Sequence, residues 1–215
     1  PGSRTQVRTG RRCLPGSKTA GKGGKKTKKS SGHEAGSSRG EGMMVRDWTI
    51  VPATLGSLTE ILRIEEACFS APWTRKMLEA ELSGNPFAHF LVARREEAAA
   101  ESIVGYLCYW IVFEEVRLMN LAVIQSMRHR GIAKSLVASA LQTGMSQSAH
   151  RAVLEVRASN QAAQRLYEGF GFSRTAVRPK YYANPVEDAV LMELAPIAVN
   201  GGSLCHEQGG HRLLQ

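Results

Sequence analysis

The chain has 215 residues and a net charge of +9, and 43% of its residues are hydrophobic. This length suits one domain with tails or two small domains, and the hydrophobic content allows an ordinary packed core. Residues 1–40 hold eleven Lys or Arg and one Glu, so the excess positive charge lies in this segment alone. The charge therefore does not indicate a folded nucleic-acid-binding face.

Residues 1–42 are rich in Gly, Ser, Lys and Arg and contain few large apolar side chains. Such a segment cannot bury enough surface to offset its ordering entropy, so we predict a disordered basic tail. Its run KGGKKTKKSSG could contact RNA phosphates. The alternative is that the native protein starts near Met43 or Met44, where globular patterning begins. Gly and polar residues return at the other end, so residues 43–195 are the predicted folded domain and 196–215 a flexible tail.

The cysteines and histidines predict neither disulfide bonds nor a metal site. The four cysteines are widely spaced: Cys13, Cys68, Cys108 and Cys205. Cys68 and Cys108 lie in apolar segments and are predicted to be buried thiols in a reducing compartment. A Gly-rich terminus holds the one close group, Cys205, His206 and His211, and gives little support for metal binding. No apolar run reaches the ~18 residues of a membrane span, and no secretory signal is recognisable, so we expect a cytoplasmic protein.

Hydrophobic periodicity predicts alternating strands and helices. The first helix has Ser57 as its predicted N-cap and the second has Thr74. In chain order the predicted elements are a strand at 48–54, helices at 57–69 and 74–82, strands at 89–94, 102–113 and 116–124, a helix after Gly131, a strand at 151–159, a helix at 160–170, and strands at 173–182 and 188–194. This order predicts one mixed α/β (α+β) domain with antiparallel strands and at least one β-α-β crossover.

Residues 128–133, Arg-His-Arg-Gly-Ile-Ala, lie where a predicted strand turns into a predicted helix. The N-terminus of a helix presents unpaired N–H groups to an anion, and Gly131 lets backbone approach it closely. Ala133 is small, and Arg128, Arg130 and Lys134 add positive charge. The motif is neither a Walker loop nor a GxGxxG fingerprint. It predicts a phosphate site, and the alternative is a basic surface turn.

The pattern Arg128-x-x-Gly131-x-Ala133 after a strand resembles the acetyl-CoA pyrophosphate loop of the GNAT acetyltransferase superfamily. The segments SAPWT, MNLAV, LEVRASNQAAQRLYEGFGF and KYYANPVEDAVLM resemble its RimI branch in the same order, over about residues 45–194. Enzymes of that branch acetylate the N-terminal alanine of small-subunit ribosomal protein number eighteen. The resemblance implies the GNAT fold, a mixed and mostly antiparallel sheet with a central splayed parallel pair flanked by helices. It also implies acetyl-CoA as co-substrate and no metal, and it does not extend to the two tails.

The resemblance also implies roles for particular residues. The splayed strand would present backbone groups to pantetheine at Leu121, Ala122 and Val123. The loop and first helical turn would hold the pyrophosphate with His129, Arg130, Gly131, Ile132, Ala133 and Lys134. Asn160 matches an asparagine that contacts the CoA arm, and the catalytic base and acid fall on Glu155 and Tyr167. By the same analogy the peptide cleft is bordered by Trp73, Tyr181, Tyr182, Glu187 and Asp188.

Glu155 lies in the middle of a predicted strand, where an unpaired carboxylate is costly to bury. It either forms an ion pair with Arg151 or Arg157 on its own face or lines a wet cleft. If Glu155 acts as a base, it can readily remove a proton from an α-amine. The reference pKa of an α-amine is ~7.7–8.0, whereas that of lysine is ~10.4. These values favour an N-terminal amine over a lysine side chain as the acceptor.

Asn160 and Tyr167 also have structural alternatives. Asn160 or Ser159 is a good N-cap for the helix that follows. Tyr167 shares an apolar helical stripe with Leu166 and Phe170, which is typical of a core residue. A tyrosine with a reference pKa of ~10 can nevertheless donate a proton to a departing thiolate, whose thiol has a pKa of ~8.5.

The sequence therefore predicts an acetyl-CoA-dependent N-acetyltransferase that works by direct attack of the amine, because no cysteine has a recognisable nucleophile setting. One alternative is an enzyme of relaxed specificity for other N-termini, lysines or small amines. Another is a ribosome- or RNA-associated protein that binds CoA without catalysis, which the basic tail motivates.

Overall fold

The computed structural model describes residues 8–9, 47–95 and 102–198. Within the predicted N-terminal tail it describes only β1 (Arg8–Thr9). The rest of residues 1–42, residues 96–101 and the group formed by Cys205, His206 and His211 lie outside the described residues. The disorder predicted for residues 1–42 and 196–215 therefore stays a prediction for the residues outside the described ranges. Within them, the Ile197 N–H donates to the His150 carbonyl at 2.8 Å.

The predicted order of helices and strands is confirmed. After β1 the elements are β2 (Trp48–Pro52), α1 (Leu58–Cys68), α2 (Arg75–Glu79), β3 (Ala88–Arg95), β4 (Ile103–Val112), β5 (Glu115–Val123), α3 (Ile132–Ser146), β6 (Arg151–Arg157), α4 (Gln161–Glu168), β7 (Ser173–Ala183) and β8 (Val186–Leu194). Short helical turns precede α1 (η1, Leu55–Ser57), follow α2 (η2, Ala80–Gly84) and follow β5 (η3, Gln125–Met127).

The first two helices begin in different ways. Thr74 caps α2 as predicted, since its Oγ1 atom accepts a hydrogen bond from the Met77 N–H at 3.3 Å. Ser57 precedes α1, but its Oγ atom accepts from the Thr54 N–H at 3.2 Å and not from α1. Ser57 occupies the N-cap position of α1 as predicted, but its side chain makes no capping bond there, because a single 3-10 turn that begins after Thr54 leads directly into the helix.

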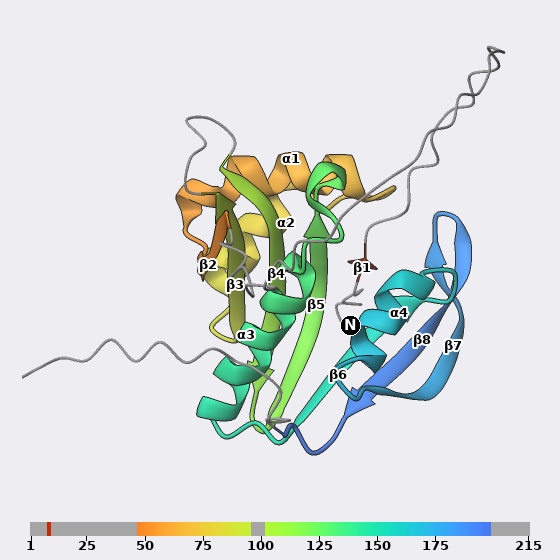
Figure 1. The fold of residues 1–215 in the computed structure, drawn as a ribbon. Helices are drawn as coiled ribbons and strands as arrows, with labels where there is room; N and C mark the ends of the chain where they lie inside the picture. The colour runs from red at the N-terminus through yellow and green to blue at the C-terminus, as the bar shows by residue number, and fades with distance from the viewer. Residues whose placement is uncertain (1–7, 10–46, 96–101, 199–215) are drawn as a thin grey trace, which may run out of the picture.

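In the described part of the chain, eight strands form one sheet. Seven follow the order β2-β3-β4-β5-β6-β8-β7, with every neighbouring pair antiparallel except β5 and β6. The two-residue strand β1 pairs in parallel with β5, off this path. Figure 1 shows α3 and α4 in front of this sheet.

Helices on the two faces of the sheet bury two apolar clusters. One lies under α3 and α4 and includes Leu136, Leu154 and Tyr167. The other lies under α1 and α2 and includes Ile61, Cys68 and Cys108. Burying a side chain of this size contributes about 1.5–3 kcal/mol. As predicted, Cys68 and Cys108 are buried thiols that form no disulfide among the described residues. Among residues 47–95 and 102–198, no helix is long and apolar enough to span a membrane.

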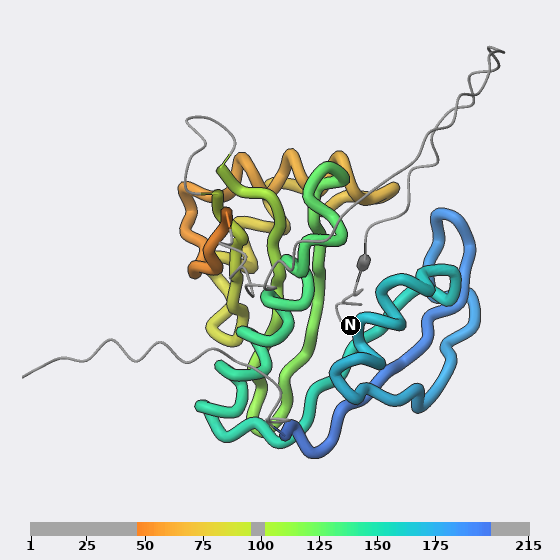
Figure 2. Tube along the Cα trace, viewed as in Figure 1, coloured from red at the N-terminus to blue at the C-terminus, as the bar shows by residue number. Residues whose placement is uncertain are grey.

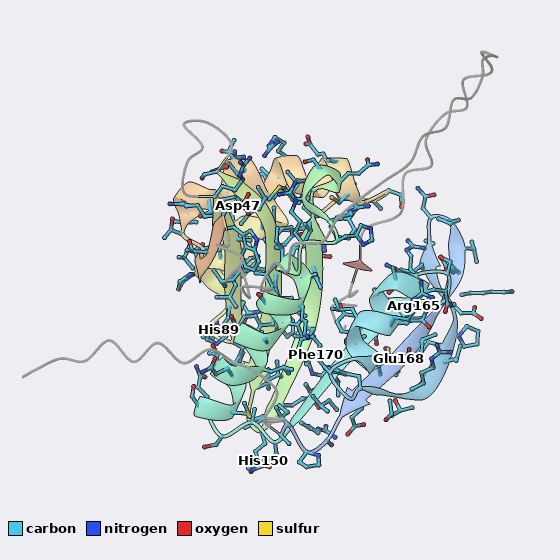
Figure 3. The ribbon with its side chains drawn as sticks, in the orientation of Figure 1. Asp47, His89, His150, Arg165, Glu168 and Phe170 are labelled. Carbon is cyan, nitrogen blue, oxygen red and sulfur yellow. The ribbon has the colours of Figure 1, made fainter. Side chains whose placement is uncertain are left out.

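The parallel strands β5 and β6 pair only over their first halves. Glu115–Leu118 lies opposite Arg151–Leu154, after which the pairing stops. In Figure 2 the two strands run close together at the lower end and separate toward the upper end. His150, which precedes β6, marks the lower end where they meet (Figure 3). We call the unpaired parts of β5 and β6 beyond these residues the splay, and its presence confirms the predicted splayed parallel pair.

A β-bulge in β5 accounts for the splay. Tyr109 of β4 lies opposite Leu118, whereas the preceding Cys108 lies opposite Asn120, so Met119 is an additional residue in β5. Met119 and Asn120 consequently both face α1, where Met119 joins the apolar cluster and Asn120 bonds a side chain of that helix. A bulge bends its strand and increases the local twist, which directs β5 away from β6.

Candidate active site

The edge of β5 at the splay carries backbone N–H and C=O groups that pair with none of the other strands from β2 to β8. The Ile124 N–H donates to the Val104 carbonyl of β4 at 2.9 Å. Because successive residues of a strand point their backbone groups to opposite sides, Leu121 and Val123 direct theirs toward the splay. Ala122 directs its N–H and C=O toward β4. Of the three residues predicted to contact pantetheine, Leu121 and Val123 can therefore offer backbone hydrogen bonds to a ligand.

The position of β1 shows that this edge accepts an extended chain. Arg8 lies opposite Asn120 and Thr9 opposite Leu121 in a parallel pairing. Figure 1 shows β1 between β5 and β6, and it approaches both strands. A ligand arm with amide groups at similar spacing could form the same hydrogen bonds.

The loop before α3 has the backbone geometry of an anion site. Gly131 is the N-cap residue of α3 and has a left-handed conformation, with φ of 82°. A Cβ atom placed there would meet no atom within 4 Å, so the space in front of the helix is open. His129 also has positive φ, 63°. The first N–H groups of a helix, here those of Ile132, Ala133 and Lys134, have no intrahelical partner and can bind an anion.

The three cations of the loop are placed differently from one another. The Arg128 guanidinium turns back to β5, where its Nε atom donates to the Val123 carbonyl at 3.0 Å. Arg128 therefore orders the loop, and the contribution of its positive charge to a phosphate site stays a prediction. Arg130 lies 3.7 Å from the Asp47 carboxylate, at the upper end of the sheet in Figure 3. Lys134 is exposed on the first turn of α3 and forms no ion pair with the described residues.

Glu155 lies on β6 and forms an ion pair with Arg178 of β7. Neither partner considered from the sequence is correct, because Arg151 pairs with Glu115 and Arg157 is also engaged elsewhere. The side chain of Glu155 is 15% exposed. Its Oε2 atom is buried and accepts no hydrogen bond from the described residues. One carboxylate oxygen is thus held by Arg178, and the other is a buried acceptor with unused hydrogen-bonding capacity. The Tyr181 side chain also hydrogen-bonds this carboxylate.

Tyr167 lies on α4 and is fully buried. Its ring packs against Phe172, with ring centroids 5.7 Å apart. Its hydroxyl has no hydrogen-bond partner among the described residues. Burial raises the pKa of Tyr167 above its ordinary value, so the phenol stays protonated near neutral pH. A buried hydroxyl without a partner costs about 1–3 kcal/mol, which a purely structural role leaves unexplained.

Glu155 and Tyr167 approach the splay from opposite faces of β6. Leu154 and Val156 share an apolar cluster with Tyr167 on the side of α3 and α4. Since side chains alternate along a strand, Glu155 projects to the side of α1 and α2. Two substrates that enter from opposite faces could therefore meet in the splay, one beside each group.

Asn160 is the N-cap residue of α4, and its Oδ1 atom accepts from the Ala163 N–H at 3.1 Å. The capping role considered for Asn160 is therefore present, and Ser159 does not take it. The role of Asn160 toward the CoA arm stays a prediction.

The residues expected at the peptide cleft are mostly buried or paired. Tyr182 is fully buried beneath the guanidinium of Arg157, which lies 4.1 Å from the ring centroid. Arg157 also pairs with Glu187 at 3.1 Å. Burial alone would raise the pKa of Glu187, but hydrogen bonds from Ser159 and Arg157 lower it overall. Asp188 accepts from a backbone N–H. These carboxylates are engaged within the fold, so they are poorly placed to attract a cationic peptide.

Sequence reasoning missed two participants in the site. One is Arg178, which pairs with Glu155 across two strands. The other is Glu65, a fully buried acid on α1 that accepts a hydrogen bond from the Trp73 N–H at 2.7 Å. A signal for Glu65 exists, because it occupies an apolar stripe with Ile61 and Cys68 at helical spacing.

The sequence profile described as the Acetyltransferase (GNAT) family matches residues 58–172, from the start of α1 to the loop after α4. The chain belongs to the GNAT family of acetyltransferases. It is therefore an acetyl-CoA-dependent acyltransferase, and the matched region contains the splay, the loop before α3, Glu155 and Tyr167. Among the described residues, no three His, Cys, Asp or Glu side chains gather as metal ligands.

The GNAT relatives include enzymes of the RimI branch. The [ribosomal protein bS18]-alanine N-acetyltransferase of Haemophilus ducreyi is 32% identical over 149 residues, which cover 68% of this chain and 97% of that protein. The enzyme of the same name from Escherichia coli K12 is 30% identical over 153 residues, covering 70% and 99%. The crystal structure of the ribosomal-protein-S18-alanine N-acetyltransferase from Escherichia coli superimposes with a TM-score of 0.63 at 26% identity, covering 73% and 98%. The resemblance to this branch of the GNAT family is confirmed.

Replacing Gly131 by Val should weaken acetyl-CoA binding by tenfold or more, because the side chain would project into the open space before α3. Isothermal titration calorimetry with acetyl-CoA measures this effect. Strain at positive φ also lowers stability by about 1–2 kcal/mol, so a control with equal strain is needed. Gly171→Val provides it, since Gly171 has φ of 94° and lies in the loop after α4. Wild-type acetyl-CoA affinity in Gly131→Val would mean that the phosphates bind elsewhere.

Proposed function

We propose that this enzyme transfers the acetyl group of acetyl-CoA to the N-terminal α-amine of a protein, and that its substrate is the N-terminal alanine of ribosomal protein bS18. The observation that carries the proposal is the splay, with two buried polar groups on its opposite faces that have no hydrogen-bond partner among the described residues. They are the Oε2 atom of Glu155 and the hydroxyl of Tyr167. The names of the Haemophilus ducreyi and Escherichia coli relatives support the choice of substrate.

Acetyl-CoA would bind from the side of α3 and α4. Its pyrophosphate would accept hydrogen bonds from the N–H groups of the first turn of α3, next to Gly131, with Lys134 adding positive charge. Its pantetheine arm would extend along β5 and bond the backbone of Leu121 and Val123 in place of β1. The thioester would then lie in the splay close to Tyr167.

The amine would enter from the side of α1 and α2 and lose its proton to the Oε2 atom of Glu155, directly or through water. The neutral nitrogen attacks the thioester carbon, and backbone N–H groups of β5 at the splay stabilise the oxyanion. As the tetrahedral intermediate collapses, the C–S bond breaks and the CoA thiolate takes the proton of Tyr167. The nitrogen gives up its second proton, which returns to the Tyr167 phenolate directly or through water. The products are the N-acetylated peptide and CoA, and no covalent enzyme intermediate forms.

Because the proposed substrate is a ribosomal protein, we place the reaction in the cytoplasm. The proposal assigns no catalytic role to the basic tail. A chain that starts at Met43 should therefore acetylate peptides at least as well as the full chain. If ribosome affinity also stays unchanged in that truncated chain, the alternative of a non-catalytic RNA- or ribosome-binding protein loses its support.

The proposal is tested by the mass of bS18 in cells of the source organism. Deleting the gene should remove one acetyl group from the N-terminus of bS18, and a plasmid copy of the wild-type gene should restore it. A plasmid copy encoding Glu155→Gln is the matched control and should not restore it. If bS18 keeps its acetyl group in the deletion strain, bS18 is not the substrate of this enzyme or not its substrate alone.

A further inference from the structure

Glu65 is a fully buried acid that the proposed acetyl transfer does not use. It lies on α1 and accepts hydrogen bonds from donors on three other parts of the chain. These donors are the backbone N–H of Trp73, the hydroxyl of Tyr106 on β4 and the side-chain amide of Asn120 on β5. The Asn120 Nδ2 atom also lies 2.7 Å from the Tyr106 hydroxyl, so the four residues form one connected network.

The network joins the loop between α1 and α2 to the strand that forms the splay. Trp73 lies at the end of this loop, directly before the α2 cap residue Thr74. Asn120 follows the bulge residue Met119 and directly precedes Leu121, whose backbone faces the splay. Because of the bulge, Asn120 points toward α1 and can reach Glu65. The carboxylate thus fixes the loop relative to the place where the acetyl group would be transferred.

The network also lies on the side of the sheet from which the acceptor would come. Glu65, Trp73 and Asn120 are on the face covered by α1 and α2, to which Glu155 also projects. A buried charge is an expensive way to fill a core, since well-packed apolar side chains of similar volume are often at least as stabilising. Directional bonds to a carboxylate do, however, fix the relative position of the elements that donate them.

We infer that Glu65 is a positioning residue for the acceptor peptide, holding the loop at residues 69–74 against β5 so that the α-amine reaches Glu155 and the thioester. The inference rests on the proposed function for the identity of the acceptor. It assigns no chemical step to Glu65, and it predicts a defect in the use of the peptide that exceeds any defect in the use of acetyl-CoA.

Glu65→Gln keeps the shape of the side chain but replaces one acceptor oxygen by an N–H donor, which faces other donors in the network. We expect the KM for an N-terminal Ala peptide to rise by about tenfold. This change corresponds to the loss of one hydrogen bond to a charged group. The KM for acetyl-CoA should change by less than about threefold. In hydrogen exchange without substrates, the amides of residues 69–74 should exchange faster than in the wild type.

Glu115→Gln is the matched control. Glu115 is a buried carboxylate at the other end of β5, where it pairs with Arg117 and Arg151, far from the splay. Glu115→Gln should lower the Tm without raising the KM for the peptide or the exchange rate of the loop. The double variant Glu65→Gln/Asn120→Asp swaps the amide and the carboxylate between the two positions, so the two groups again face each other. This double variant should recover the KM for the peptide to within about threefold of wild type.

The outcomes separate the inference from the proposed function. If Glu65→Gln lowers the Tm but keeps the wild-type KM for the peptide, Glu65 is only structural and the inference is wrong. If Glu65→Gln does not fold, Tyr106→Phe removes one donor and keeps the charge, and it must raise the KM in the same direction for the inference to stand. If the wild type acetylates no α-amine, the proposed function fails, while the exchange rates of residues 69–74 still decide whether Glu65 holds the loop.

Discussion

Glu155→Gln should lower kcat by about 100- to 10,000-fold, the range expected when a general base is removed. The amide keeps the size of the side chain but cannot accept the proton of the attacking amine. Acetyl-CoA affinity should change little, because the proposed acetyl-CoA contacts lie on β5 and α3. Steady-state kinetics with an N-terminal Ala peptide and calorimetry with acetyl-CoA measure the two effects separately.

The control for this substitution is Glu193→Gln. Glu193 is a partly exposed carboxylate on β8, next to β6 in the sheet, and lies 3.9 Å from Arg151. Its loss removes a carboxylate close to β6 without touching the splay, so kcat should stay at the wild-type value. Unaltered turnover of Glu155→Gln between about pH 6 and pH 9 would remove Glu155 as the base.

Tyr167→Phe should separate activity from stability. We expect kcat to fall by about 100-fold or more, because the proposed proton donor to the CoA thiolate is lost. We expect the Tm to stay the same or to rise, because the substitution removes a buried hydroxyl that has no partner among the described residues. Initial rates and thermal unfolding of the same preparation measure both. Since burial raises the pKa of Tyr167, its deprotonation should not limit kcat below about pH 10.

Tyr109→Phe is the corresponding control in the same apolar cluster. The Tyr109 hydroxyl forms a hydrogen bond with Thr143 of α3, and the ring stacks on His89. Removing that hydroxyl should cost about 1 kcal/mol of stability and leave kcat unchanged. Wild-type kcat in Tyr167→Phe would show that the leaving thiolate obtains its proton from another donor, and a large loss of stability would show that the hydroxyl has a structural partner.

The order of the elements could be predicted because each rests on local signals. Apolar residues recur with helical or strand spacing, and Gly84, Asn85 and Pro86 form a clear stop signal at the end of η2, the turn that continues α2. The N-cap position of Ser57 was predicted correctly, but its side-chain capping bond is missing because a 3-10 turn that begins after Thr54 leads into the helix. The splay itself could be proposed only through a family resemblance, since nothing local in the sequence reveals that Met119 is a bulge.

The contacts that tune the site could not be predicted because they join residues far apart in the chain. Glu155 meets Arg178 through the pairing of β6 with β8 and of β8 with β7, and β7 changes register between Arg178 and Tyr182. Such a shift decides which side chain faces Glu155 and cannot be read from alternation. Arg128 was predicted to add positive charge to the loop, but its hydrogen bond to the Val123 carbonyl could not be read from the sequence.

The most direct test of the central claim is to incubate the purified protein with acetyl-CoA and two peptide sets, and to locate any acetyl group by mass spectrometry. One set has a free N-terminal Ala followed by varied residues, and the other has a blocked N-terminus and internal Lys. The account predicts acetylation confined to the α-amine of the Ala peptides. Acetylation of Lys alone would keep the fold but contradict the proposed substrate. No transfer to either set, with acetyl-CoA still bound, would contradict transfer to a peptide amine.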